Sequence, residues 1–125
     1  MVKISEKKEI KEILMGLRHR ISDIEGCSVV SRDGLVVASE LMAEVESKAF
    51  AALSADVTKS GEVVSSELRI GGLGQIIINS SKGNIITANV GKKAILVCLV
   101  KPKANVGLVL LHMDRTSQRL LRYIK

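Results

Sequence analysis

Apolar residues fill both faces of one short stretch of the chain, residues 94–100. A strand at a protein surface keeps one polar face, because successive side chains point to opposite sides of the sheet. Here both alternating faces are apolar: Ala94, Leu96, Cys98 and Val100 on one, and Ile95, Val97 and Leu99 on the other. The pattern predicts a central strand that other layers cover on both faces.

Two segments at the ends of the chain have the 3.6-residue periodicity of amphipathic helices. The first, residues 5–21, has Ser5 as its predicted N-cap and an apolar face made of Ile10, Ile13, Leu14, Leu17 and Ile21. Pro102 ends the central strand, and Asn105 is the predicted N-cap of a last helix that runs to Ile124. The inner face of this last helix is predicted to consist of Val106, Val109, Leu110, Met113, Leu120 and Ile124.

A hairpin is predicted early in the chain. Residues 26–32 and 35–39 both resemble strands, and only Asp33-Gly34 separates them. Asp-Gly between two such runs is typical of a two-residue turn in which both positions have positive φ.

Residues 45–68 predict a longer helix with two distinct faces. Phe50, Leu53, Val57, Ser60 and Val64 form an apolar face that is expected to pack on the sheet. About 100° around the helix lies a seam of small residues: Ser47, Ala51, Ser54, Thr58, Gly61 and Ser65. A seam without bulk allows another helix to approach closely, and a second copy of the same helix would make a two-fold contact. The alternative is a solvent-exposed stripe that is small by chance.

Residues 74–80 and 84–90 complete the strands. Short turns connect them with the central strand, so the three form a meander. Residues 75–79 look most like its edge, although Ile76, Ile77 and Ile78 would leave that edge apolar. Gly71-Gly-Leu-Gly74 precedes a strand and has no following Lys-Ser/Thr, so it predicts a tight bend rather than a phosphate-binding loop.

The resulting fold class is mixed α/β (α+β), in the order α-β-β-α-β-β-β-α. A five-stranded antiparallel sheet is expected to lie between the long helix on one face and the first and last helices on the other. The 125 residues fit one domain, 1–125.

The formal net charge of +6 raises the possibility of nucleic-acid binding. However, Phe50 and Tyr123 are the only aromatic residues, and no helix-turn-helix or zinc-finger pattern is present. A solvated basic surface, or a patch for an acidic protein or for lipid headgroups, accounts for the charge better. Because no run approaches the ~20 apolar residues that cross a bilayer, we expect no membrane span and a cytoplasmic location.

Residues that could support catalysis or metal binding are scattered. Cys27 and Cys98 lie in apolar strands, where reduced thiols behave as small hydrophobic groups; a disulfide or a metal pair is the alternative. His19 and His112 have no ligand partner at metal spacing. Arg32 or Arg69 could act as an arginine finger, but nothing in the sequence would hold either in place. We therefore predict no catalytic residues, no cofactor and no metal.

Several of these segments together resemble the Roadblock (dynein light-chain) family. The resemblance rests on the hairpin Ile24-Glu-Gly-Cys-Ser-Val-Val-Ser-Arg-Asp-Gly-Leu-Val-Val-Ala-Ser39, on Leu73-Gly-Gln-Ile-Ile-Ile78, on the Gly83 turn and on Asn105-Val-Gly-Leu108. It implies the five-stranded sheet described above. It also implies that the long helix and the following edge strand meet their counterparts in a second copy, so that two sheets join into one.

The resemblance implies a binding function as well. Family members typically bind small Ras-like GTPases, as regulators of nucleotide hydrolysis or as scaffolds, and others attach to motor complexes. We therefore expect a homodimeric, non-catalytic platform for a Ras-like GTPase, although a heterodimer with a related chain stays open. The predicted dimer interface consists of Ser47, Ala51, Ser54, Thr58, Gly61, Ser65, Ile76, Ile77 and Ile78. The alternatives are an assembly scaffold without effect on GTP turnover, and a basic module for anionic lipid or nucleic acid.

Overall fold

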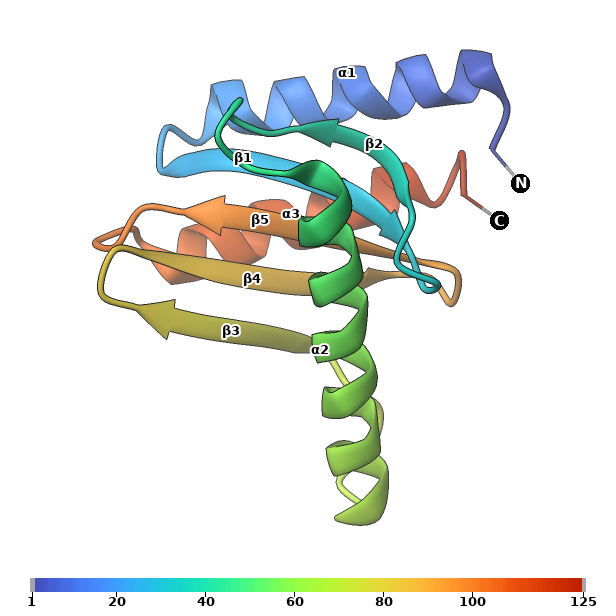
Figure 1. The fold of residues 1–125 in the computed structure, drawn as a ribbon, viewed down its shortest axis with the longest axis vertical. Helices are drawn as coiled ribbons and strands as arrows, with labels where there is room; N and C mark the ends of the chain where they lie inside the picture. The colour runs from blue at the N-terminus through green and yellow to red at the C-terminus, as the bar shows by residue number, and fades with distance from the viewer. Residues whose placement is uncertain (1, 125) are drawn as a thin grey trace.

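The structure is a computed structural model that describes residues 2–124. Its five strands form one antiparallel sheet in the order β2-β1-β5-β4-β3 (Figure 1). The elements are α1 (Ile4–Arg20), β1 (Ile24–Ser31), β2 (Val36–Glu40), α2 (Ser47–Glu67), β3 (Gln75–Ser80), β4 (Gly83–Val90), β5 (Ala94–Val100) and α3 (Val106–Leu120). The predicted order of elements, the central position of β5 and the edge position of β3 are confirmed.

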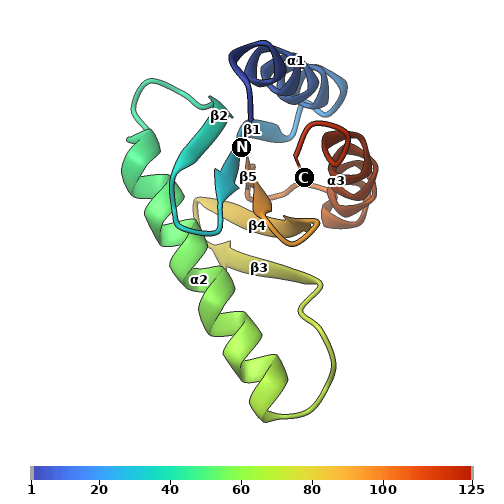
Figure 2. The same ribbon diagram turned by 90° about the vertical axis from the view of Figure 1, so that its right-hand side faces the viewer.

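Helices cover both faces of the sheet, as Figure 2 shows: α2 lies on one face, and α1 and α3 lie on the other. Strand β5 supplies side chains to both layers, because its positions alternate between them. Leu96 and Cys98 pack into the larger cluster with α1 and α3, whereas Ile95 and Val97 pack into the smaller cluster under α2. The doubly apolar pattern of residues 94–100 therefore has the predicted structural cause.

The prediction for the two faces of α2 is correct for Phe50, which packs against the sheet, but it is wrong for most of the other residues. The small residues Ala51, Ser54 and Thr58 are buried, whereas Leu53 and Val64 are exposed. The buried hydroxyl groups are satisfied within the helix: Ser54 Oγ donates to the Phe50 carbonyl at 2.7 Å, and Thr58 Oγ1 donates to the Ser54 carbonyl at 2.9 Å. Small side chains with internal hydrogen bonds let the helix backbone approach the sheet closely without leaving unpaired polar groups.

The end of α2 also differs from the prediction. Its C-terminal half extends beyond the sheet, and residues 68–74 return to β3 as an open loop rather than a tight bend (Figure 2). Arg69, with φ 54°, ends the helix: its N–H donates to the Ser66 carbonyl at 3.1 Å, and the N–H of Ile70 donates to the Ser65 carbonyl at 3.1 Å. This is the Schellman arrangement, which satisfies the last carbonyls of a helix.

The helix N-termini confirm one predicted cap and correct another. Asn105 caps α3, because its Oδ1 accepts from the Leu108 N–H at 3.1 Å. Helix α1 begins one residue before Ser5, and its N-cap is Lys3, whose N–H donates to the Glu6 carboxylate at 3.1 Å. The carboxylate of a glutamate at the third helical position can therefore accept a hydrogen bond from the N-cap backbone N–H, even where the N-cap side chain makes no capping hydrogen bond.

The hairpin between β1 and β2 is confirmed, but its turn is not a two-residue turn. The Gly34 N–H donates to the Ser31 carbonyl at 3.0 Å, and among the residues of this turn only Gly34 has positive φ, at 86°. The pairing register shifts between Val29 and Val30, so the longer turn joins an irregular ladder. Asp33 therefore does not need the left-handed conformation that the two-residue turn would impose.

Gly34→Ala is expected to lower the free energy of unfolding by about 1–3 kcal/mol. The φ of 86° disfavours any L side chain, and an added Cβ would lie 3.2 Å from the Ala52 Cα in α2. Urea unfolding followed by circular dichroism measures the loss. Gly72→Ala is the control, because nothing lies within 4 Å of its Cβ position. Equal stability of the two variants would contradict the prediction.

The two cysteines lie directly opposite each other on β1 and β5, and both are free and fully buried. The Cys27 thiol donates to the Leu14 carbonyl at 3.5 Å. Burial raises the pKa of Cys27 to about 12, against a smaller lowering by Arg18, and burial also raises the pKa of Cys98. The expectation of reduced, core-like thiols is confirmed.

These raised pKa values predict alkali sensitivity. Unfolded thiols ionise near pH 8.5, whereas the buried thiols stay protonated to higher pH. Their contribution to stability is therefore fully present below the unfolded pKa and declines as the pH rises towards about 12. Denaturation at pH 7 to 10.5 tests this, with Cys27→Ala/Cys98→Ala as the control. The double variant should lose less stability over this pH range, and equal losses would contradict the assignment.

Candidate interaction surface

The exposed side of α2 carries an apolar flank, which we define as Leu53, Val57, Val64 and Leu68. Leu53, Val64 and Leu68 are 65%, 54% and 64% exposed. Spacings of four, seven and four residues place all four on one side of the helix. Isolated exposed leucines are normal in soluble proteins, but a row of them along one helix indicates a contact surface.

Strand β3 is the second part of this surface. Among residues 2–124 it pairs with β4 alone, so its other edge offers backbone N–H and C=O groups to a further strand. Ile77 and Ile78 are 47% and 39% exposed, and Ile76 is half-buried. The structure thus leaves the Ile76–Ile78 edge open, as the sequence predicted.

The flank and the edge are neighbours. A Cβ added to Gly61 would lie 2.8 Å from Ile76 Cδ1 and 3.2 Å from Leu73 Cδ2, so Gly61 faces the start of β3. Val57 and Val64, four residues before and three after Gly61, lie on the same side of α2. The apolar flank and the open edge therefore form one surface.

Some of the predicted interface residues are buried within the single copy, and others are exposed. Ala51, Ser54, Thr58 and Ser65 are buried under α2, and Ser47 and Gly61 are half-buried. The four buried residues are covered by their own chain and are not free to contact a second helix, whereas Ser47 and Gly61 keep part of their surface exposed. The sequence analysis missed Leu53, Val57, Val64 and Leu68 as interface candidates, since it assigned the first three to the core.

A polar network ties α2 to the rest of the fold. Arg32, in the hairpin turn, forms an ion pair with Glu62 of α2 and donates a long hydrogen bond of 3.5 Å to Asn89 Oδ1 in β4. Asn89 Nδ2 in turn donates to the Leu73 carbonyl at 3.2 Å. Arg32 is therefore held in place, contrary to the sequence-based expectation, and it acts as a link between elements rather than as a projecting finger.

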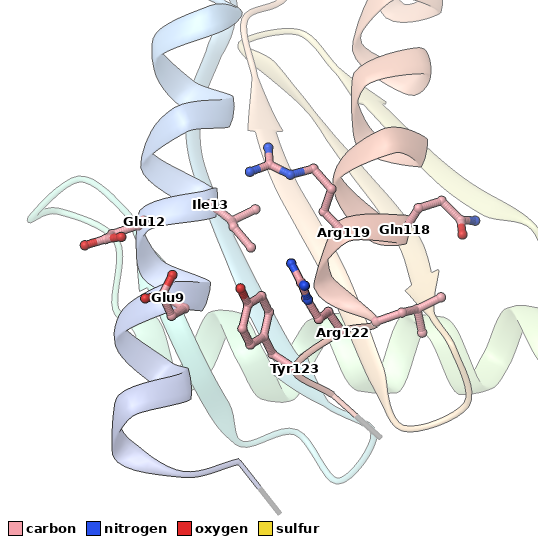
Figure 3. A pocket seen from close by; sticks show the side chains of 8 residues that line it. Glu9, Glu12, Ile13, Gln118, Arg119, Arg122 and Tyr123 are labelled. Atoms are coloured by element: carbon pink, nitrogen blue, oxygen red, sulfur yellow. The ribbon is translucent and has the colours of Figure 1, made fainter.

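A groove of about 590 Å³ lies between α1 and α3. Figure 3 shows Arg119, Arg122 and Tyr123 pointing from the α3 side towards Ile13 and Glu9 of α1. Glu9 and Glu12 line one wall and the two arginines line the other, so the charges of the groove compensate one another. This balance gives the groove no preference for an anionic or a cationic partner.

The part of the chain that the structure describes has neither a cluster of metal-binding side chains nor a membrane-spanning helix. Among residues 2–124, no three His, Cys, Asp or Glu side chains are grouped to hold a metal. The helices within that range are all too short or too polar to span a bilayer. The exposed apolar surface of α2 and β3 is the candidate for function.

Comparison with known proteins places this architecture in a family. The model of the Roadblock/LC7 domain matches residues 10–100. The chain belongs to the Roadblock/LC7 family. This result confirms the resemblance: the β1–β2 hairpin and the Ile76–Ile78 strand lie within the matched range, whereas Asn105–Leu108 lies beyond it. Roadblock/LC7 domains are typically binding modules rather than enzymes.

Individual relatives support the assignment. An uncharacterised protein of Methanocaldococcus jannaschii is 32% identical over 111 residues, which cover 89% of this chain and 92% of that protein. MglB of Myxococcus xanthus has a similar structure, with a TM-score of 0.87, 16% identity, and coverage of 98% of this chain and 92% of that one. A Roadblock/LC7 domain from Streptomyces avermitilis has a TM-score of 0.70 at 26% identity, with coverage of 89% and 97%.

Proposed function

We propose that this Roadblock/LC7 protein is a cytoplasmic, homodimeric, non-catalytic platform that binds a small Ras-like GTPase and regulates its cycle. Membership of the Roadblock/LC7 family supports a role in binding or regulating small GTPases. The observation that carries the dimer is the exposed apolar flank of α2 beside the open edge of β3. Both features expose groups that a second copy can cover.

A two-fold dimer satisfies both features at once. Two β3 edges pair antiparallel, which extends the sheet and satisfies the unpaired backbone groups. The same rotation brings the apolar flanks of the two α2 helices together, because flank and edge lie on one side of each copy. The interface residues in this arrangement are Leu53, Val57, Val64, Leu68, Ile76, Ile77 and Ile78.

Binding and GTP-turnover assays with a Ras-like GTPase from the same organism test whether the protein binds such a GTPase and regulates its cycle. The purified dimer is expected to bind one nucleotide state more tightly and to change the rate of phosphate release from GTP. Binding without a change in the rate would leave an assembly scaffold as the function. Absence of binding in both the GDP and the GTP state would contradict the proposal.

The net charge of +6 keeps a basic module for anionic lipid or nucleic acid as the competing function. Such binding depends steeply on salt, because each neutralised phosphate releases counterions. Binding of the protein to the GTPase, to anionic vesicles and to nucleic acid at about 50 mM and 300 mM salt separates the two. Binding to vesicles or nucleic acid that falls steeply with salt, without any binding to the GTPase, would favour the basic module.

A further inference from the structure

A second pocket, of about 550 Å³, lies at the end of the molecule where the chain termini meet the two hairpin turns. Figure 1 shows both termini, the β1–β2 turn and the β4–β5 turn at this end. Its described lining residues come from the N-terminal segment, α1, the β1–β2 hairpin, the β4–β5 turn, the start of β5 and the C-terminal segment. The pocket is thus separate from the α2 and β3 surface, and its function is independent of dimerisation.

The walls of this pocket are mainly apolar: Val2, Leu35, Val36, Val37, Ala94 and Ile124. Ala94 and Ile124 are buried and form the floor, whereas Leu35 is 68% exposed. A volume of this size and a predominantly apolar lining are typical of sites that hold small ligands. Apolar walls alone do not select a ligand, so the polar groups at the mouth decide its chemistry.

The mouth is positively charged. Lys7, Lys92 and Lys93 line it and are exposed, and Asp33 is the one carboxylate among the described lining residues. The ion pairs found within residues 2–124 use other lysines and arginines, so these three ammonium groups have no carboxylate within 4.0 Å there. Arg32 also lines the pocket, but Glu62 already neutralises it. Three lysines against one aspartate favour an anionic group.

From this combination we propose that the pocket binds a single-chain anionic amphiphile, of which a medium-chain fatty acid is the simplest case. The acyl chain lies against the apolar walls, where each buried methylene is favourable. The carboxylate stays at the mouth, in contact with water and with the lysines, because burial of an ionised group without partners is costly. Flexible lysine side chains can follow the head group while their stems extend the apolar wall.

Titration of the full chain with octanoate, decanoate and dodecanoate, below the concentrations at which they form micelles, tests this proposal. Calorimetry is expected to show one saturable site, and the affinity is expected to rise about fourfold per added methylene. In nitrogen–proton correlation spectra, the amide signals of Val37, Lys93 and Ala94 should shift, and those of Ile77 and Val64 should not. Decanol, which lacks the carboxylate, should bind at least about threefold more weakly than decanoate.

Two surface variants test the roles of the mouth and the wall without disturbing the core. Lys92→Gln/Lys93→Gln should lower the decanoate affinity by at least about threefold and lower decanol binding much less, because Gln keeps part of the apolar stem but has no charge. Leu35→Gln should lower both affinities, since it removes apolar wall. Lys101→Gln/Lys103→Gln is the matched control, because it removes two exposed lysines outside the pocket and should change neither affinity.

Three results would overturn the proposal. The first is no saturable binding of any fatty acid in the series. The second is equal binding of decanoate and decanol, because the lysines would then select nothing. The third is binding only to vesicles of anionic phospholipid, because a basic end that adheres to a membrane surface would then replace the pocket. The first two results leave the proposed GTPase platform untouched, whereas the third would favour the basic lipid-binding module that competes with it.

Discussion

Leu53→Asp/Val64→Asp is expected to convert the protein from a dimer to a monomer. Each side chain is more than half exposed in a single copy, so the substitution does not disturb folding. The proposed dimer buries Leu53 and Val64 of both copies. Each of these side chains contributes about 1.5–3 kcal/mol to the free energy of association. Their loss, together with the burial of carboxylates, raises the dissociation constant by at least about a thousandfold. Light scattering coupled to size exclusion measures the change.

The matched control for this variant is Leu108→Asp/Leu111→Asp. These leucines also lie on a helix and are 42% and 47% exposed, but α3 covers the other face of the sheet. The control variant should remain a dimer. A monomeric wild-type protein at about 50 µM, or equal loss of association in both variants, would contradict the assignment of the interface to α2 and β3.

Leu96→Ala is expected to lower the free energy of unfolding by about 2–5 kcal/mol. Leu96 is fully buried at the centre of β5 and packs into the cluster under α1 and α3, so truncation leaves a cavity that neighbouring strands cannot close. Chemical unfolding gives the value, measured at a protein concentration that keeps the association state constant.

Leu108→Ala serves as the comparison for this loss, because it removes the same atoms from an exposed position. It is expected to change the free energy of unfolding by no more than about 0.5 kcal/mol. A loss below about 1 kcal/mol for Leu96→Ala would mean that β5 is not the central element of the core.

The order of the elements and the position of β5 could be predicted from the sequence, because burial on both faces is a property of the strand alone. Every residue of 94–100 is apolar, and only a covered, central strand explains that. The open edge at Ile76–Ile78 was predictable for a similar reason. Alternation shows which side chains share a face, and the partly polar face marks the strand that lies outermost.

The faces of α2 could not be predicted in the same way. Periodicity identifies a row of apolar residues, but it does not say whether the row packs on its own sheet or on another molecule. Leu53 and Val64 were assigned to the core for this reason, although they are exposed. Gly61 and Thr58 were the residues that could have shown the correct face. Such residues are poor choices for an exposed helix surface, but they fit where the helix backbone lies close to the sheet.

Local details escaped the sequence because tertiary contacts decide them. The Asp33-Gly34 turn is lengthened by the register shift in the β1–β2 ladder and by the packing of Gly34 against α2. The ion pair of Arg32 with Glu62 joins residues 30 positions apart, and only the placement of α2 on the sheet brings them together. The pocket at the chain ends likewise combines segments that no local pattern connects.

The pairing of β1 with β5 has a consequence for biosynthesis. A ribosome releases the N-terminal end first, so residues 24–31 emerge long before residues 94–100, their neighbours in the finished sheet, have been translated. Until then the nascent polypeptide can form only two separate hairpins, β1–β2 and β3–β4, because β5 is the strand that joins them. Chains stalled before residue 94 are therefore expected to be preferred clients of chaperones that bind at the exit tunnel.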